Sequence, residues 1–225
     1  MTTLIVGCSF TVNLKFCDQV DHSKYKVYGS PGSSNQAIAA RVLHEVTQQT
    51  INHVVVLWSG LNRLSMPLPL DLHRTFDYNY VDVVGNTAWY HSGGMGCSGQ
   101  SVEAPRVVKQ YFDSQYIGAS SEYLTDQTLA NIIAVQTLLE SRGITCDMSF
   151  IYDVHDAAPS QHEVSHGKIS STALYNQVNW AKFTAKQPPW EWACSRQMLD
   201  NDGYHPSKSG MITWFKEQLG IDLTQ

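Results

Sequence analysis

The chain lacks the features that mark membrane-spanning, exported and nucleic-acid-binding proteins. No apolar stretch approaches the roughly 18 residues of a membrane-spanning helix, and its first residues have neither the basic flank nor the apolar length of a signal peptide. Fifteen Lys and Arg residues against 20 Asp and Glu residues give a formal charge of -5, without long basic runs. This balance does not favour binding to a phosphate backbone. We therefore expect a cytoplasmic protein with no membrane span and no nucleic-acid partner.

Paired cysteines are missing as well. The five cysteines are an odd number and show no Cys-x-x-Cys spacing, which disfavours both a disulfide framework and a zinc ribbon. The Gly-x-Ser-x-Gly pattern of the α/β-hydrolase nucleophile elbow is also absent. What remains is an ordinary globular composition, with 43% hydrophobic and 16% charged residues. At this length we expect a single domain over residues 1–225.

Short apolar runs that alternate with amphipathic segments predict an α/β fold with a central parallel sheet. Thr3 to Val6 and His53 to Trp58 are predicted strands, and polar residues follow each of them directly. Ligands of parallel sheets bind beyond the carboxyl ends of the strands, so these polar segments lie where a site belongs. Further strands are predicted at Tyr25 to Tyr28 and Ile144 to Tyr152, and helices from Ala37 to Val46, Glu122 to Arg142 and Ser207 to Leu219.

Three segments have less regular patterns. Residues 63–120 are rich in aromatic residues and punctuated by proline and glycine, which predicts an irregular, loop-rich insertion over the site. Residues 173–183 are predicted to form a weak helix. A fifth strand is expected just before Asp202, although residues 190–199 have no convincing strand pattern.

The first and last polar segments supply a nucleophile and a base. Ser9 follows the first predicted strand, and its hydroxyl becomes nucleophilic only when a base removes its proton. His205 is the candidate base. Asp202, three residues earlier, is placed to bind the second imidazole nitrogen and so fix the tautomer, and Asp200 is a competing candidate for this role.

Two further segments carry groups that stabilise negative charge on a carbonyl oxygen. Gly32 lies in the loop after the second predicted strand, and Asn62 follows the third. The backbone N–H groups of Ser9 and Gly32 and the side-chain amide of Asn62 are candidate donors of an oxyanion hole. Together with the nucleophile and the base, they indicate a serine hydrolase.

These segments resemble the four sequence blocks of the SGNH hydrolases, also called the GDSL esterase and lipase family. The blocks are Gly7-Cys8-Ser9, Gly32, Gly60-Leu61-Asn62 and Asp202-Gly203-Tyr204-His205-Pro206, and their order and spacing span most of the chain. The resemblance implies a three-layer α/β/α flavodoxin-like fold and ester hydrolysis. It implies Ser9 as nucleophile, His205 as base and Asp202 as orienting carboxylate. Ser9, Gly32 and Asn62 form the implied oxyanion hole.

Two residues depart from the family pattern. Cys8 replaces the usual Asp of the first block, which removes an acceptor that helps to hold the nucleophile turn, and Arg63 stands where the third block commonly has Asp. The resemblance implies no metal and no organic cofactor. The expected partner is a small-molecule or carbohydrate ester, and the aromatic residues of the insertion and of the Trp190-Trp192 region favour an acetylated carbohydrate. The blocks also resemble those of members encoded by tailed bacteriophages, which makes virion association an alternative location.

Other patterns indicate other functions. His162-Glu163-Val164-Ser165-His166 matches the H-E-x-x-H motif of zinc hydrolases, but its polar, helix-breaking flanks allow barely two helical turns. His155 and Asp156 are further candidate metal ligands nearby. The Gly94 to Gly99 segment matches G-x-G-x-x-G, but no apolar strand leads into it, so a loop is expected.

A non-catalytic protein is the remaining alternative, because a fold does not settle a function. It would be a glycan-binding module or a structural subunit of a larger assembly. The candidate residues for stacking on sugars are Trp89, Tyr90, Trp190 and Trp192, for which packing in the core is the competing interpretation.

Overall fold

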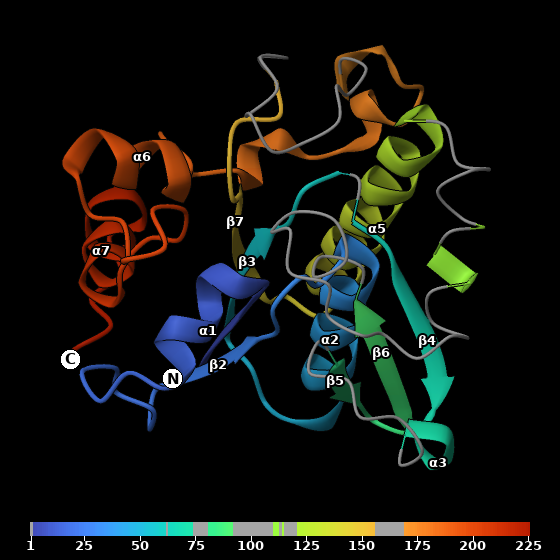
Figure 1. Ribbon diagram of the computed structural model, residues 1–225, viewed down its shortest axis with the longest axis horizontal. Helices are drawn as coiled ribbons and strands as arrows, with labels where there is room; N and C mark the ends of the chain where they lie inside the picture. The colour runs from blue at the N-terminus through green and yellow to red at the C-terminus, as the bar shows by residue number, and fades with distance from the viewer. Residues whose placement is uncertain are drawn as a thin grey trace.

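The chain forms a mixed α/β structure built on two sheets (Figure 1). This computed structural model describes residues 2–61, 63–73, 81–91, 110–112, 114, 121–155 and 169–225. The first sheet is parallel and contains β1 (Thr3–Gly7), β2 (Tyr25–Gly29), β3 (His53–Trp58) and β7 (Thr145–Phe150), in the order β2-β1-β3-β7. The strand predictions at the four corresponding runs are therefore confirmed.

Helices lie on both sides of the parallel sheet in Figure 1. On one side are α1 (Ser9–Lys15), α6 (Pro189–Arg196) and α7 (Lys208–Trp214), which continues as a π-helical turn, η5 (Phe215–Leu219). On the other side are α2 (Asn35–Gln48) and α5 (Ser121–Ser141), which pack against each other. Within the described parts of the chain, no helix is both long and apolar enough to cross a membrane.

The strand order places a topological switch point between β1 and β3. The chain leaves β1 towards β2 at one edge of the sheet, whereas it leaves β3 towards β7 at the opposite edge. Because the connections diverge, the carboxyl ends of these neighbouring strands frame an opening where ligands of doubly wound sheets bind. Ser9 follows β1 and Ser59 follows β3, so both chain segments begin at this switch point.

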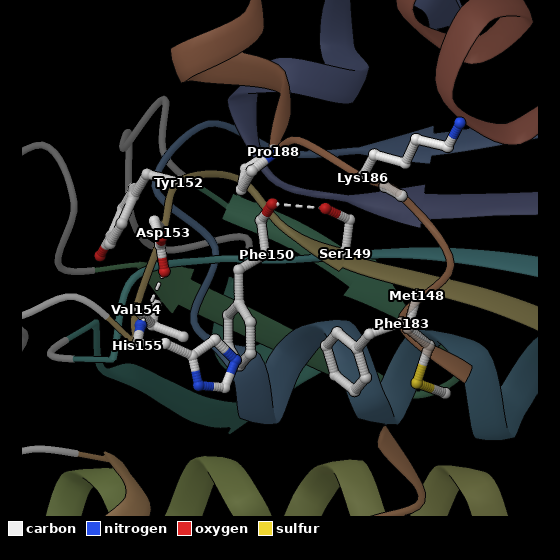
Figure 2. A pocket seen from close by; sticks show the side chains of 11 residues that line it. Met148, Ser149, Phe150, Tyr152, Asp153, Val154, His155, Phe183, Lys186 and Pro188 are labelled. Carbon is white, nitrogen blue, oxygen red and sulfur yellow. Dashed lines mark hydrogen bonds between the residues drawn. The ribbon is translucent and has the colours of Figure 1, made fainter. Parts of the chain in front are cut away.

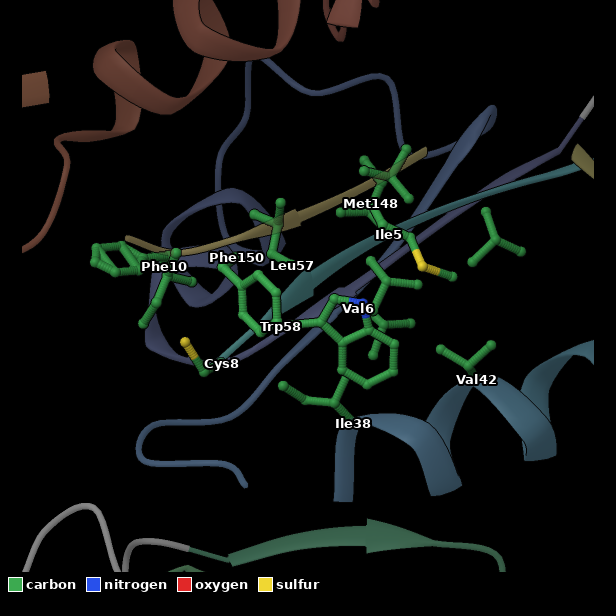
Figure 3. Packing of buried hydrophobic residues seen from close by; sticks show 14 of the residues in the cluster. Ile5, Val6, Cys8, Phe10, Ile38, Val42, Leu57, Trp58, Met148 and Phe150 are labelled. Atoms are coloured by element: carbon green, nitrogen blue, oxygen red, sulfur yellow. The ribbon is translucent and has the colours of Figure 1, made fainter. Parts of the chain in front are cut away.

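The core lies between the parallel sheet and its helices (Figure 3). Val54 to Trp58 of β3 are fully buried, as a strand with helices on both faces requires. The Trp58 ring lies near Ile38 and Val42 of α2, while Phe10 of α1 is also fully buried. The segment that carries Ser9 and its neighbouring strands are therefore anchored in the main core.

The region expected to be irregular contains a second sheet. This sheet is antiparallel and contains β4 (Ser65–Pro69), β5 (Val81–Val84) and β6 (Thr87–His91), in the order β4-β6-β5, with a short helix α3 (Leu70–His73) after β4. Pro67 and Pro69 lie in β4, which is an edge strand, where a residue without an N–H group is tolerated. The two prolines therefore do not prevent this segment from forming a strand.

Residues 173–183 do not form the predicted helix. They contain two 3₁₀ turns, η3 (Tyr175–Gln177) and η4 (Trp180–Lys182), and a third, η2 (Ile169–Ser171), precedes them. The Gln136 side chain of α5 accepts from the backbone N–H of Asn179 at 2.9 Å and donates to its carbonyl at 3.0 Å. These bonds tie the backbone to another element, and the segment has no continuous helical ladder.

The expected fifth strand is replaced by α6. Pro189 at its first turn is compatible with a helix start, and Pro189, Trp192 and Ala193 share its buried face. The backbone N–H of Trp190 donates to the carbonyl of Ile151, just beyond β7, at 3.1 Å. This helix therefore begins beside the sheet without extending it.

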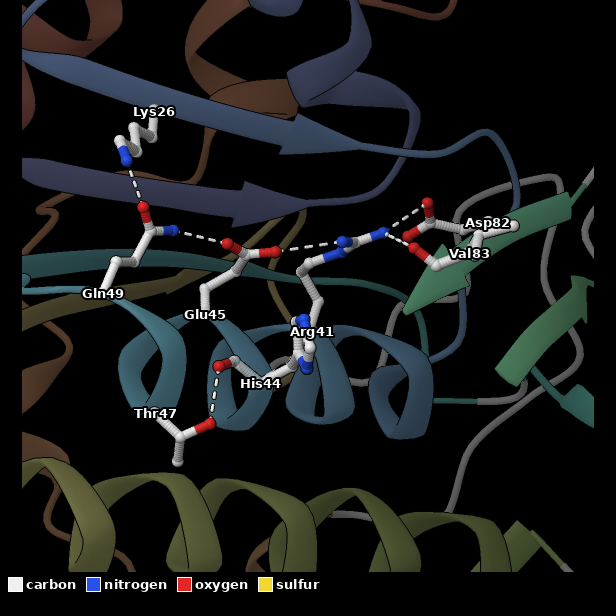
Figure 4. Close-up of polar contacts among 8 residues, drawn as sticks. All are labelled: Lys26, Arg41, His44, Glu45, Thr47, Gln49, Asp82 and Val83. Atoms are coloured by element: carbon white, nitrogen blue, oxygen red, sulfur yellow. Dashed lines mark hydrogen bonds and ion pairs between the residues drawn. The ribbon is translucent and has the colours of Figure 1, made fainter. Parts of the chain in front are cut away.

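Arg41 of α2 joins the two sheets through a buried charge network (Figure 4). Its guanidinium binds the Glu45 carboxylate at 3.0 Å and the Asp82 carboxylate of β5 at 2.7 Å, and it also donates to the carbonyl of Val83. The same group lies over the Tyr28 ring, 4.8 Å from its centroid. Arg41 and Glu45 are both buried, so each charge depends on the other.

We expect Arg41→Met to lower the free energy of unfolding by about 3 to 5 kcal/mol, because it leaves the Glu45 carboxylate buried without its cation. Urea unfolding followed by fluorescence measures this change. Arg196→Met is the matched control. The ion pair of Arg196 with Glu217 is largely exposed, so that variant is expected to lose no more than about 1 kcal/mol. Equal losses in the two variants would contradict a special role for the buried network.

Candidate active site

Ser9, His205 and Asp202 form a continuous hydrogen-bonded chain. The Nε2 atom of His205 lies 2.9 Å from the Ser9 hydroxyl oxygen, and its Nδ1 atom lies 2.5 Å from Oδ2 of Asp202. Ser9 and His205 are 196 positions apart in the sequence, so the fold brings them together. In this order the imidazole links a hydroxyl to a carboxylate, which is the geometry of a nucleophile, base and orienting acid.

Ser9 owes its position to the sharp passage from β1 into α1. A Cβ atom on Gly7 would lie 2.7 Å from the Thr11 side chain, and one on Gly29 would lie 2.2 Å from it. Glycine at both positions therefore lets α1 pack directly on β1 and β2. The Thr11 hydroxyl is 2.8 Å from the Cys8 carbonyl and 3.2 Å from the Tyr28 carbonyl. Thr11 thus helps to hold the turn that carries Ser9, while the Cys8 side chain is buried and makes no capping hydrogen bond.

The loop that carries His205 is closed by its own hydrogen bonds. Oδ1 of Asp202 accepts from the backbone N–H groups of Tyr204 at 2.8 Å and His205 at 2.9 Å. The backbone N–H of Asp200 donates to the His205 carbonyl at 2.7 Å, and Gly203 supplies the left-handed conformation of the turn with φ 67°. These contacts fix the imidazole relative to the carboxylate.

The same contacts distinguish Asp202 from Asp200. Burial of the Asp202 carboxyl acts to raise its pKa, but hydrogen bonds from the backbone N–H and imidazole of His205 and from Tyr204 outweigh it and keep the pKa below its ordinary value. Asp202 therefore stays ionised beside the imidazole. The Asp200 carboxylate instead accepts from the backbone N–H of Asn201 at 2.8 Å. Of the two predicted candidates, the structure places Asp202 on the imidazole.

Two aromatic rings flank the imidazole of His205. The Phe10 ring centroid lies 5.4 Å from it, and the Tyr204 ring meets it edge-on at 5.1 Å. From the other side of the loop, the Asn13 side chain donates to the Pro206 carbonyl at 3.3 Å. Helix α1 therefore contacts both His205 and Pro206, which couples the positions of Ser9 and His205.

The candidate oxyanion-hole residues are described only in part. The Ser9 backbone N–H lies in the first turn of α1, where N–H groups have no partner within the helix. Gly32 is buried in the loop after β2 and has φ 73°, a conformation that favours glycine. Asn62 lies outside the described residues, directly after the buried Leu61 at the end of the β3 loop.

The sequence pattern did not predict how the loops after β2 and β3 are joined. Asn35, the buried first residue of α2, accepts the Ser59 N–H on its Oδ1 atom at 2.7 Å. Its Nδ2 atom lies 3.2 Å from the Ser59 carbonyl, 3.4 Å from the Gly60 carbonyl and 3.1 Å from the Thr128 hydroxyl. Asn35 thus ties the Gly32 loop to the segment that precedes Asn62. Its sequence signal, an Asn beside serines in a loop, indicated only helix capping.

A separate cavity of about 210 Å³ opens at the carboxyl end of β7 (Figure 2). The rings of Phe150 and Phe183, which line it, stack with their centroids 5.4 Å apart. Asp153, His155 and Lys186 also line the cavity. Strand β3 lies between β7 and β1, and none of the triad residues lines the cavity. The cavity therefore lies at a different strand end from Ser9.

The competing motifs are mostly outside the described residues. This holds for Asp156, His162-Glu163-Val164-Ser165-His166 and the Gly94 to Gly99 segment. His155 is described, and its ring packs edge-on against Trp180 at 5.1 Å. In the described ranges, no group of three or more His, Cys, Asp or Glu side chains is arranged to hold a metal ion.

Most of the candidate sugar-stacking residues lie in the core. Trp89, Tyr90 and Trp192 are buried, while Trp190 is partly buried and packs against the main core. The side chains of Trp89, Tyr90 and Trp192 are therefore not open platforms for stacking on sugars. Comparison of the chain with protein-family models and with curated proteins finds no match.

Proposed function

We propose that this protein is a serine esterase of the SGNH type that hydrolyses carboxylic esters through an acyl-Ser9 intermediate. The observation that carries the proposal is the hydrogen-bonded chain Ser9–His205–Asp202, with contacts of 2.9 and 2.5 Å. A surface serine has no need of such a chain. A nucleophilic serine needs a base, here the imidazole, and the imidazole needs an orienting carboxylate on its second nitrogen.

In the first half of the reaction, the Ser9 oxygen bonds to the ester carbonyl carbon while its proton moves to Nε2 of His205. The carbonyl π electrons move to the oxygen, and the Asp202 carboxylate stabilises the imidazolium through Nδ1. When the tetrahedral intermediate collapses, the ester C–O bond breaks and the leaving alcohol takes the proton from His205. In the second half, water attacks the acyl group, His205 takes its proton, and collapse releases the carboxylic acid and returns the proton to Ser9.

The proposal includes an oxyanion hole formed by the N–H groups of Ser9 and Gly32 and by the Asn62 amide. Support comes from the position of the Ser9 N–H in the first turn of α1, the left-handed Gly32 and the Asn35 bridge between the two loops. It also includes the finer fold assignment, a three-layer flavodoxin-like arrangement, which the helices on both sides of the parallel sheet support (Figure 1).

Labelling with a fluorophosphonate tests the proposal directly, because this probe forms a covalent bond only with an activated serine. We expect stoichiometric labelling of the wild-type chain, with the added mass on the peptide that contains Ser9, and turnover of p-nitrophenyl acetate in the same preparation. A zinc chelator is expected to change neither result.

Two outcomes would contradict this proposal, and each favours a different alternative. Chelator-sensitive turnover that persists in Ser9→Ala would favour a zinc hydrolase that uses His162 and His166. A well-folded wild-type chain that neither labels nor turns over ester would favour a non-catalytic protein. In that case the triad geometry would be a structural feature of the fold alone.

A further inference from the structure

A second histidine, His91, lies outside the triad but contacts the loop that carries Gly32. It is the last residue of β6, is fully buried, and pairs in register with Ser65 at the start of β4. Its Nδ1 atom lies 2.8 Å from the Ser65 hydroxyl, and its Nε2 atom lies 3.3 Å from the Ser33 hydroxyl. The imidazole ring of His91 is therefore one of the contacts between the antiparallel sheet and the loop between β2 and α2.

The directions of these hydrogen bonds follow from the groups that surround them. The Ser65 hydroxyl oxygen accepts the backbone N–H of Ser34 at 3.2 Å, which leaves its own hydrogen to donate to Nδ1 of His91. The proton of the neutral ring then lies on Nε2 and donates to Ser33. A neutral ring suits the site, because burial and the nearby Arg63 charge lower the pKa of His91 to about 3.

His91 contacts Ser33 directly and Ser34 through Ser65, and these two serines follow Gly32 in the chain. Ser33 closes a turn, with its N–H 3.3 Å from the Ser30 carbonyl, and the Ser34 hydroxyl caps α2 by accepting the Ala37 N–H at 3.3 Å. Both serines are buried. The contacts of Ser33 and Ser34 therefore hold the end of the turn that follows Gly32.

We propose that His91, together with Ser65, is a positioning residue that fixes the Gly32 N–H for the oxyanion. This inference rests on the proposed esterase function, and it assigns the antiparallel sheet a role in catalysis. His91 contacts Ser33 and Ser65 and acts through the Gly32 loop. Its loss therefore affects the transition state, in which the carbonyl oxygen carries negative charge, more than the bound ester.

The test compares wild type with His91→Phe, which keeps a buried ring but removes both hydrogen bonds. We expect kcat for p-nitrophenyl acetate to fall by about ten- to a hundred-fold, because displacements of about 1 Å in a catalytic group have effects of this size. KM is expected to stay within about twofold. The rate of fluorophosphonate labelling at Ser9 should fall in parallel with kcat, because the phosphonyl oxygen occupies the same hole.

Gln136→Met is the matched control for destabilisation. It removes the side-chain amide of a buried residue of α5, which makes two hydrogen bonds with Asn179 and does not contact the Gly32 loop in these bonds. All measurements are made well below the unfolding midpoint of each variant. We expect Gln136→Met to lower the midpoint but to leave kcat and the labelling rate unchanged.

The inference is overturned if folded His91→Phe keeps wild-type kcat, or if Gln136→Met lowers kcat equally. If His91→Phe does not fold, Ser33→Ala replaces it. That variant removes a single hydrogen bond, and an unchanged kcat there would also reject the inference. A wild-type chain that does not label at Ser9 would reject the proposed esterase function and this inference with it, whereas a labelled wild type with unaffected variants would reject this inference alone.

Discussion

Ser9→Ala is expected to lower turnover of p-nitrophenyl acetate by about 10⁴- to 10⁶-fold and to abolish fluorophosphonate labelling. The substitution removes only the hydroxyl oxygen that lies 2.9 Å from Nε2 of His205, so no covalent intermediate can form. Losses of this size are typical when the nucleophile of a catalytic triad is removed. Initial rates, corrected for the uncatalysed hydrolysis of the ester, measure the effect.

His205→Ala is expected to cause a loss of similar size, and the double variant should be no worse than either single variant. Residues that act as one catalytic unit are strongly non-additive in this way. Ser195→Ala is a matched control, because its exposed hydroxyl donates only to the Trp192 carbonyl of its own helix. Multiplicative losses in the double variant would mean that Ser9 and His205 act independently, which would contradict a shared mechanism.

The predictable part of the fold is the part that buries long apolar runs. The strand predicted at His53 to Trp58 is observed with the same bounds, because five consecutive fully buried residues leave few alternatives to a central strand. Helix α1 was not predicted. Its seven residues begin without a side-chain cap, and a helix this short depends on tertiary packing, here against β1 and β2. No local pattern records that packing.

Two other differences, at β4 and at residues 173–183, arise from contacts with other elements. Pro67 and Pro69 suggested loops, but both are compatible with the edge position of β4. Whether a strand lies at an edge depends on its partners, and its own sequence does not show it. Similarly, the hydrogen bonds between Gln136 and Asn179 join α5 to the 173–183 segment. The residues of that segment alone do not show that these bonds form.

The candidate triad was predictable because its chemistry is concentrated in a few polar residues after strands and in one Asp-x-x-His loop. The residues that hold the loops were not predictable in the same way. Asn35 and His91 are buried polar groups whose partners lie at distant positions in the chain. Such residues are recognised only once their hydrogen bonds are known, since a buried polar group without partners would be costly.

Asp202→Asn is expected to lower kcat by about 10⁴-fold while the loop keeps its conformation. Oδ1 of the asparagine can still accept the N–H groups of Tyr204 and His205. Its NH₂ group, however, replaces the oxygen that lies 2.5 Å from Nδ1 of His205. An NH₂ donor favours the tautomer with a proton on Nε2, and that tautomer cannot take the proton of Ser9. The variant therefore retains the geometry and loses the base.

Asp200→Asn makes the same chemical change two residues away. Its carboxylate contacts the N–H of Asn201, a bond that asparagine can preserve, so kcat is expected to stay within about twofold of wild type. The thermal unfolding midpoints of both variants are expected to stay close to that of wild type. The two substitutions make the same chemical change, but only the Asp202 carboxylate contacts the ring. An equal loss of kcat in Asp200→Asn, or near-normal activity in Asp202→Asn, would therefore show that the carboxylate on Nδ1 does not set the tautomer of His205.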